Sequence, residues 1–500
     1  MITYNRNRQP LLGTIMNHLT KKALCLAIVT TLNGCMVGPT YENPSLAAPE
    51  SKFSNSVDIE RNNAKTKSDI ADITQWWHSF NDEQLNQYIE RALAQNLTLK
   101  QAGARVTQAH AQVTSLISQL LPSGQLNSQA TKAHISLQDL TGRVLNSVPG
   151  FNRNVEVYDL NASLNWELDI FGGTRRGIET AQAEYQAAHA SVSAAQLEIT
   201  AEVAETYVTI RTLQARIVIA KERASTQGKF VELIKLQFSR GVTAEARLRQ
   251  AEGVLAEVQA VIPALENGLE IAMNAFDVLM GDQPGTNHAQ LAIFQAIPAA
   301  PGIDTATGPT ELLRRRPDII VAERRLAASS AQIGQAISEY YPKISLTGLI
   351  GTITTKYGAL FSSGANRAAG VVGLRWRLFD FGRVEAEVAA AEGQNSEALA
   401  AYRLTVLQAA EDVENAFSTV VKKSDEQRIL TSGQTSLIKA REAAFAGYKR
   451  GALSLLEVLD ADEHLLKMRD AMTQAQSDSV RATIKSFKAL GGGWEAQSFS

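Results

Sequence analysis

The amino-acid sequence predicts a mainly α-helical protein that also carries membrane-type β-strands, built from two copies of one structural repeat. Three observations lead to this prediction: the chain is similar to itself at a fixed spacing, two very long stretches lack proline, and short segments alternate apolar and polar residues. Hydrophobic residues make up 45% of the 500 residues but aromatic residues only 6%, so much of the apolar content is alanine. Such a composition favours long helices that approach one another closely.

The charge of the chain argues against one class of partner. The formal net charge is −2, from 49 basic and 51 acidic residues. A nucleic-acid-binding protein needs a clustered basic face, which this balance gives no reason to expect. We therefore expect no nucleic-acid partner.

The internal repeat emerges when the chain is aligned with itself. With a shift of 220 residues, the segment before Pro122 aligns with the segment before Pro342, and further on the shift becomes 210. The first copy therefore carries about ten extra residues between Pro122 and Phe171. The aligned identities include Ala102 with Ala322, Arg105 with Arg325, Gln112 with Gln332, Phe171-Gly172 with Phe381-Gly382, and Gly241 with Gly451.

The repeat sets the expected organisation of the chain. Each copy contains a strand hairpin and then a long helical hairpin that reverses at a glycine, the usual residue just past a helix end. The expected parts are a signal peptide at 1–34, a lipid-linked N-terminal segment at 35–75, a first repeat at 76–310 (strand hairpin about 122–171, helical tip near Gly241), a second repeat at 311–490 (strand hairpin about 342–381, helical tip near Gly451) and a flexible tail at 491–500.

The longest predicted helices run from Gly173 to Arg240 and from Arg383 to Arg450, with no proline in either stretch. At a rise of 1.5 Å per residue, each would be roughly 100 Å long. Helices in globular proteins average about three turns. The predicted length is therefore typical of a coiled coil or a helical tube.

Four segments have the alternation of β-strands. From Tyr158 to Ile170 the even positions are apolar and the odd positions polar, which predicts a strand with one apolar face. The other segments are Gly124–Ala130, Ile344–Ile350 and Ala368–Leu378. Strands of about ten residues with this pattern are typical of membrane β-barrels, although a sheet packed on a helical domain would also show it.

A sheet in lipid must close, because every backbone donor and acceptor needs a partner there. Four strands are too few, since known bacterial barrels begin at about eight strands. We therefore expect several chains to pool their strands in one shared barrel.

The N-terminus is typical of an exported lipoprotein. Two lysines precede the apolar stretch Ala23–Leu32, which is too short to span a bilayer but suits a signal peptide. Gly34 then precedes Cys35, a pattern in which the cysteine thiol is acylated and becomes the first mature residue. Cys25 leaves with the signal, so Cys35 is then alone and no disulfide within the chain is expected. An ordinary secretory signal followed by a chance cysteine is the alternative.

The chain resembles the TolC and OprM outer-membrane efflux family, in its lipoprotein branch. The stretches that carry the resemblance are Cys35–Pro44, Trp77–Leu85, Arg315-Arg316-Pro317-Asp318-Ile319, Tyr341-Pro342-Lys343-Ile344 and Leu378–Arg383. The resemblance covers nearly all of the chain after Cys35. It implies a homotrimer whose twelve strands form one barrel above an α-helical tunnel, with a periplasmic adaptor and an inner-membrane pump as partners. Met36, directly after the cysteine, implies an anchor in outer-membrane lipid.

The same resemblance implies a periplasmic gate at the second helical tip. Leu456, Glu457 and Asp460 match the positions that narrow the tunnel in the family. Glu457 and Asp460 are three residues apart and lie on one helix face. Rings of such carboxylates bias a pore toward cations. An ordinary solvated helix face is the alternative.

One feature of the family gate is altered in this chain. Leu453 stands where some relatives have an arginine, and Arg247 stands where the aspartate that bonds it is found. Tyr448 is retained. The sequence therefore suggests a gate lock of reversed polarity, from Arg247 to Glu457 or Asp460.

The remaining motifs favour structural roles. In Arg315–Asp318 the proline suits a first helical turn and the acidic residue complements the helix dipole. Trp166 and Trp376 fit either an aromatic girdle or a buried core. The histidines show no metal-ligand spacing, and neither a phosphate-binding loop nor a nucleophile elbow is present. We expect no catalytic residue, no metal and no cofactor beyond the lipid on Cys35.

These expectations combine into one predicted function: a passive channel in the outer membrane that extends into the periplasm and exports small toxic compounds or drugs. Two alternatives stay open. One is the outer-membrane channel of a type I protein secretion system. The other is a lipid-anchored trimeric coiled-coil spacer or adhesin, which would not need strands such as Tyr158–Ile170.

Overall fold

The computed structural model describes residues 36–44, 52–66, 70–305 and 315–494, and its chain divides into two compact units. The strand unit consists of residues 36–43, Gln108–Tyr185 and Arg325–Leu399. The helical unit consists of the described residues of Pro44–Thr107, Gln186–Arg324 and Ala400–Ser500. Each unit thus draws residues from both copies of the repeat. Cys35 and the predicted signal peptide lie outside the described residues.

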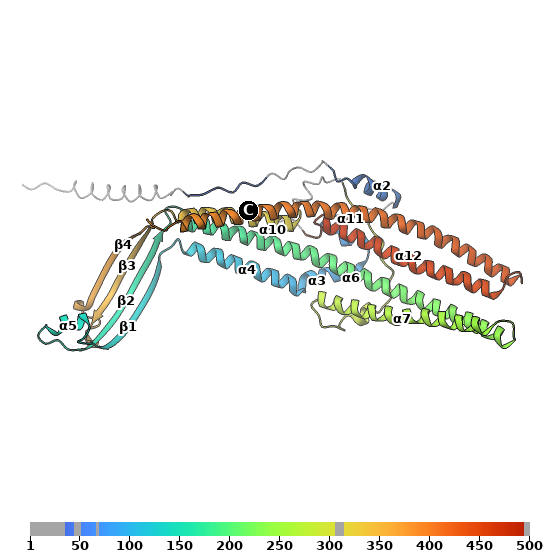
Figure 1. Cartoon of the computed structure of the whole chain (residues 1–500), viewed down its shortest axis with the longest axis horizontal. Coiled ribbons are helices and arrows are strands. Elements are labelled where there is room, and N and C mark those ends of the chain that lie inside the picture. Colours follow the sequence, from blue (N-terminus) through green and yellow to red (C-terminus); the bar gives the residue numbers. More distant parts are fainter. Residues whose placement is uncertain (1–35, 45–51, 67–69, 306–314, 495–500) are drawn as a thin grey trace, which may run out of the picture. The chain divides into compact units, whose positions relative to one another are not determined.

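The strand unit holds one antiparallel sheet of four strands in the order β1-β2-β3-β4 (Figure 1). The strands are β1 (Ser123–His134), β2 (Asn154–Leu168), β3 (Lys343–Thr354) and β4 (Asn366–Arg375). The short helix α5 (Leu140–Asn146) lies between β1 and β2, and the turns η2 (Tyr357–Ala359) and η3 (Ser363–Ala365) lie between β3 and β4. A mainly helical chain with four strands was predicted, and this is confirmed.

The pairing register places most of the large apolar side chains on one face of the sheet. Trp166 of β2 is paired with Leu346 of β3, which is paired with Val372 of β4. Paired residues point to the same face, and successive residues point to opposite faces. The apolar face accordingly collects Leu126, Ala130, Leu160, Leu164, Trp166, Ile344, Leu346, Ile350, Val372 and Leu374. The opposite face is mostly polar, and both faces of the sheet are solvent-accessible in the single chain.

The two tryptophans make the same hydrogen bond in the two copies of the repeat. The indole nitrogen of Trp166 donates to the carbonyl oxygen of Leu120 at 2.9 Å, and that of Trp376 donates to the carbonyl oxygen of Tyr340 at 3.0 Å. These partners are related by the two sequence shifts of 210 and 220. Neither tryptophan belongs to a buried core, because Trp166 is half-buried and Trp376 is exposed.

The main helices occur in pairs of equal length. Helices α4 (Leu97–Ser118) and α10 (Pro317–Ser338) have 22 residues, and α6 (Gly173–Ser239) and α11 (Arg383–Lys449) have 67. Helices α7 (Glu245–Leu279) and α12 (Leu455–Ala489) have 35 residues each. The two long helices differ by one residue at the C-terminal end from the predicted Gly173–Arg240 and Arg383–Arg450. Among the described helices, none combines the length and the apolar character that crossing a bilayer requires.

The core of the helical unit contains several aromatic side chains among aliphatic ones. Trp76, in the turn η1 (Trp76–Phe80), stacks on Phe487 of α12 with ring centroids 5.4 Å apart. Around it pack side chains of α3 (Glu83–Gln95), α6, α7, α11 and the short helix α8 (His288–Leu291). Helix α2 (Ser56–Thr66) adds the fully buried Ile59 to the same core.

The C-terminal residues differ from the sequence expectation. A flexible tail was expected from residue 491, but the backbone nitrogen of Gly493 donates to the carbonyl oxygen of Ile73 at 2.9 Å and Trp494 is buried. Trp494 is a large apolar side chain, and its burial holds the glycines before it in place. Residues 491–494 therefore belong to the helical unit.

Candidate functional site

The candidate gate lies where the two long helical hairpins of the helical unit reverse (Figure 1). Gly241 separates α6 from α7 and Gly451 separates α11 from α12, with φ of +70° and +74°. The two turns have equivalent hydrogen bonds. The backbone nitrogen of Gly241 donates to the carbonyl oxygen of Phe238, and that of Gly451 donates to the carbonyl oxygen of Tyr448, each at 2.9 Å. A positive φ favours glycine, because other residues meet a steric penalty there. The tip glycines thus stand where the helices reverse.

The second tip is closed by a helix cap. Ser454 precedes α12 and accepts a hydrogen bond from the backbone nitrogen of Glu457, while the carboxylate of Glu457 accepts one from the backbone nitrogen of Ser454 at 2.7 Å. This reciprocal arrangement is a capping box, and it satisfies two backbone donors at the helix start. Glu457, expected only as a gate residue, therefore also stabilises the start of α12.

The first tip lacks this cap. Ala244 takes the place of Ser454 and makes no side-chain cap hydrogen bond. Arg247 takes the place of Glu457, so a positive charge lies in the first turn of α7, where the helix dipole disfavours it. The two tips share a backbone conformation but differ in charge and in stability of the helix start.

Leu456 makes an apolar contact between the two hairpins of the chain. It is half-buried and packs against a cluster of Ile234 on α6 with Leu248 and Ala251 on α7. Phe230 and Val231 of α6 complete this cluster. The position expected to narrow a tunnel is thus, within one protomer, also the position where α12 rests on the first hairpin.

Asp460 is exposed and has a titratable neighbour that the sequence reasoning did not include. Nε2 of His464 lies 3.5 Å from a carboxylate oxygen of Asp460, one helical turn along α12. Both side chains are more than half exposed. The spacing of four residues on one helix was the signal in the sequence that predicts this neighbour.

The two acids of the suggested lock have other partners within one protomer: in the described part of the chain, neither acid is hydrogen-bonded to Arg247 or Tyr448. Glu457 is bonded to Ser454 and Asp460 lies beside His464, while Arg247 and Tyr448 are both exposed near their tips. Among the described residues of one protomer, no hydrogen bond or ion pair joins Arg247 to either acid. The lock stays a prediction about the assembled protein.

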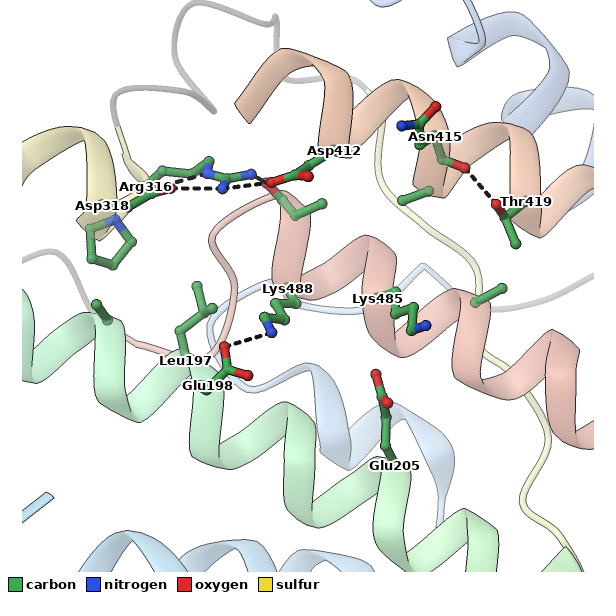
Figure 2. Close-up of a pocket in the computed structure, with 15 residues that line it drawn as sticks. Leu197, Glu198, Glu205, Arg316, Asp318, Asp412, Asn415, Thr419, Lys485 and Lys488 are labelled. Carbon is green, nitrogen blue, oxygen red and sulfur yellow. Dashed lines mark hydrogen bonds and ion pairs between the residues drawn. The ribbon is translucent and has the colours of Figure 1, made fainter. Parts of the chain in front are cut away.

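Arg316 is the centre of the charged motif Arg315–Asp318 (Figure 2). Its guanidinium donates to Asp318 at 2.8 Å, to Asp412 of α11 at 2.9 Å and to the carbonyl oxygen of Ala489 in α12 at 3.1 Å. Burial acts to lower the pKa of Arg316, but hydrogen bonds and charge from Asp318 and Asp412 outweigh it and raise the pKa. The guanidinium therefore stays charged and joins the start of α10, the middle of α11 and the end of α12.

This network lines a cavity of about 590 Å³. Lys488 forms an ion pair with Glu198 of α6 on the opposite wall (Figure 2). Pro317 begins α10 and Asp318 lies in its first turn, so the structural interpretation of the motif is confirmed. Within the described ranges, no group of three or more His, Cys, Asp or Glu side chains is placed to hold a metal ion.

Comparison with known proteins gives consistent matches over most of the chain. The family described as "Outer membrane efflux protein" matches residues 88–282 and 308–492. Nodulation protein T of Rhizobium leguminosarum bv. viciae is 31% identical over 474 residues, which cover 93% of this chain and 92% of that protein. Outer membrane protein OprJ of Pseudomonas aeruginosa is 29% identical over 479 residues, 94% of this chain and 95% of OprJ.

The fold has a solved counterpart in the outer-membrane channel OprN. The two structures superpose with a TM-score of 0.78 at 31% sequence identity. The match covers 92% of this chain and 100% of the OprN chain. Similarity in sequence and similarity in fold thus extend over nearly the same residues.

Proposed function

Because this chain belongs to the outer membrane efflux protein family, we propose that it is the outer-membrane channel subunit of a tripartite efflux system. Three copies form one barrel and one tunnel, held in the outer membrane also by a lipid on Cys35. A periplasmic adaptor and an inner-membrane pump deliver the cargo and supply the energy. The channel itself is a passive conduit for small toxic compounds or drugs and has no catalytic activity.

The observation that carries this proposal is the two-faced register of the sheet. Its apolar face presents large side chains such as Leu126, Ile350, Val372 and Leu374, all of which are exposed in the single chain. Exposed apolar surface of this extent marks a surface that is covered in the working protein. Acyl chains of the bilayer are the covering that suits strands of this length and pattern.

The sheet edges support a trimer. β1 pairs only with β2, and β4 only with β3, so each edge has a row of backbone donors and acceptors without a strand partner in this sheet. In hydrocarbon such edges are intolerable, and closure with neighbouring copies removes them. Three copies give twelve strands, which is within the range of known bacterial barrels.

The polar face then lines the lumen. It includes Asn127 and Asn161, which hydrogen-bond each other at 3.4 Å, and Thr347, which bonds Asn165 at 2.8 Å. A water-filled pore needs such a wall. In the helical unit, the carboxylates of Glu457 and Asp460 from three copies form the gate and favour cations in the closed state.

Reconstitution in planar lipid bilayers tests the channel. Protein extracted from the outer membrane in detergent should give stable single-channel currents, and heat-denatured protein serves as the control. A deletion strain should become sensitive to toxic small molecules and regain resistance with the intact gene. A deletion strain that keeps its resistance but no longer exports a protein would instead support type I secretion.

A further inference from the structure

The first described residues of the chain are held tightly in the strand unit. The backbone nitrogen of Val37 donates to the carbonyl oxygen of Phe171, at the junction between β2 and α6, at 3.3 Å. Tyr41, a few residues on, packs against Ala183, Ala327 and Ala328. A chain terminus is ordinarily poorly ordered unless something ties it down. Here specific contacts tie it to α6 and α10.

Arg176 on α6 provides the polar part of this attachment. Its Nε donates to the carbonyl oxygen of Val37 and its Nη2 to that of Gly38, both at 3.0 Å. Nη1 bonds Glu179 at 2.7 Å. With the segment in place the side chain is only 3% exposed, and the carbonyl oxygens of residues 37 and 38 satisfy two of its shielded donors. A buried donor without a partner is strongly unfavourable, so these bonds stabilise the segment in this position.

Three glycines provide the space for the segment. A Cβ on Gly172 would lie 2.7 Å from Cγ of Met36, and a Cβ on Gly334 would lie 2.9 Å from the carbonyl oxygen of Val37. Gly38 has φ of +90°, and a Cβ there would lie 2.3 Å from Cα of Gly334. No residue with a side chain fits at the contact of Gly38 with Gly334. The backbone of the segment thus lies directly on α10.

The second copy of the repeat lacks the same site. The shift of 210 places Ala386 where Arg176 stands, and the shift of 220 places Thr114 where Gly334 stands. Phe381, the counterpart of Phe171, is fully exposed, whereas Phe171 stacks on Tyr341 with ring centroids 4.6 Å apart. The site is therefore a feature of one copy and not a general property of the fold of the repeat.

We propose that Arg176, Gly172 and Gly334 form a docking site for Met36–Gly38, and that this site fixes the lipid-bearing N-terminus beside the junction of β2 and α6. Met36 directly follows Cys35, so docking sets the point from which acyl chains enter the bilayer, next to the strands that cross it. This role rests on the proposed function, because it takes Cys35 to be the lipidated residue.

The test uses the full-length protein with a nitroxide label on Glu42→Cys, an exposed position in the segment. Electron paramagnetic resonance then reports how freely the segment moves. We expect slow motion in this parent and in the control Arg383→Ala, an exposed arginine at the start of α11. We expect fast motion in Arg176→Ala, because the segment loses both carbonyl bonds. An unchanged line shape in Arg176→Ala would overturn the docking site.

Gly334→Ala separates displacement of the segment from damage to the fold. Alanine is a better helix former than glycine, so α10 itself is not weakened, yet the added methyl group occupies the space of the segment and of Arg176. We expect fast motion of the Glu42→Cys label in this variant too. If the segment stays immobile in Gly334→Ala, the docking site is wrong, even if Arg176→Ala fails to fold.

Thiol titration of the same Glu42→Cys protein tests the lipid anchor on Cys35 separately from the docking site. A mature chain with acylated Cys35 has one reactive thiol, at position 42, and supports the anchor. Two reactive thiols would contradict the lipid anchor of the proposed function. A mobile label on the parent would contradict the docking site alone.

Discussion

The guanidinium of Arg367 on β4 reaches over β3 and donates to both carboxylate oxygens of Asp159 on β2, at 2.7 and 2.6 Å. Gly351 is the residue of β3 that is paired with Arg367 in the register, and a side chain there would lie on the polar face between the two. A Cβ on Gly351 would lie 2.3 Å from the carbonyl oxygen of Leu160. The glycine thus leaves the space in which a charged pair spans three strands.

Loss of this pair should weaken the sheet. Arg367→Ala removes the ion-pair partner of the half-buried Asp159, which we expect to destabilise the protein by about 1–3 kcal/mol per chain. The measurement is the temperature at which the detergent-extracted oligomer dissociates. Arg375→Ala is the control: its partner Glu167 lies 3.6 Å away and both are exposed, so it should change stability by less than about 1 kcal/mol. Equal effects of the two variants would contradict the assignment.

Glu457 caps α12, and substitution can separate this role from its proposed role in the gate. Glutamine preserves the capping box but removes the charge, so Glu457→Gln should lower the cation selectivity of reconstituted channels and leave thermal stability unchanged. Glu457→Ala also removes the cap and should destabilise α12 by about 0.5–2 kcal/mol. Reversal potentials in a salt gradient measure the selectivity. Full cation selectivity in Glu457→Gln would show that this carboxylate is not part of the gate.

The suggested lock predicts a leaky channel when Arg247 is removed. If Arg247 bonds Glu457 or Asp460 in the assembled protein, Arg247→Ala should raise the open probability of reconstituted channels several-fold. Arg249→Ala is the matched control, because Arg249 pairs with Glu245 and Glu252 on its own helix. If Arg247→Ala has the same conductance and gating as the unmodified channel, the suggested lock is wrong.

The Arg316 network should be important for stability and not for transport selectivity. Arg316→Ala removes bonds to Asp318, Asp412 and the end of α12, and we expect a loss of about 2–3 kcal/mol. Thermal unfolding followed by circular dichroism measures this loss, and ion selectivity measured on the folded fraction should stay constant. A large selectivity change with unchanged stability would instead place Arg316 in the conduction path.

Local patterns in the sequence predicted the elements of the fold well. The alternation in Tyr158–Ile170 located β2, but the strand begins earlier, at Asn154, because residues 154–157 pair with the end of β1. β4 ends at Arg375, before the predicted Leu378, and it has only β3 beside it in the single chain. Alternation reports which face is apolar, whereas the ends of a strand depend on its partners.

Contacts between distant residues were beyond sequence reasoning. Nothing near Arg316 in the sequence points to Asp412, and nothing near Arg176 points to the carbonyl oxygens of Val37 and Gly38. The capping box of Ser454 and Glu457 could have been predicted from the sequence, because its pattern lies within four residues. Glu457 was instead interpreted only as a gate residue. Local hydrogen bonds can be read from spacing, and long-range ones need the fold.

The proposed channel forms only if copies of the chain join their sheets in a lipid bilayer. Native mass spectrometry of the protein extracted from outer membranes in detergent tests this most directly. We predict a particle with the mass of three chains, each starting at Cys35 and carrying acyl groups. A water-soluble particle with the mass of one unacylated chain would contradict the account.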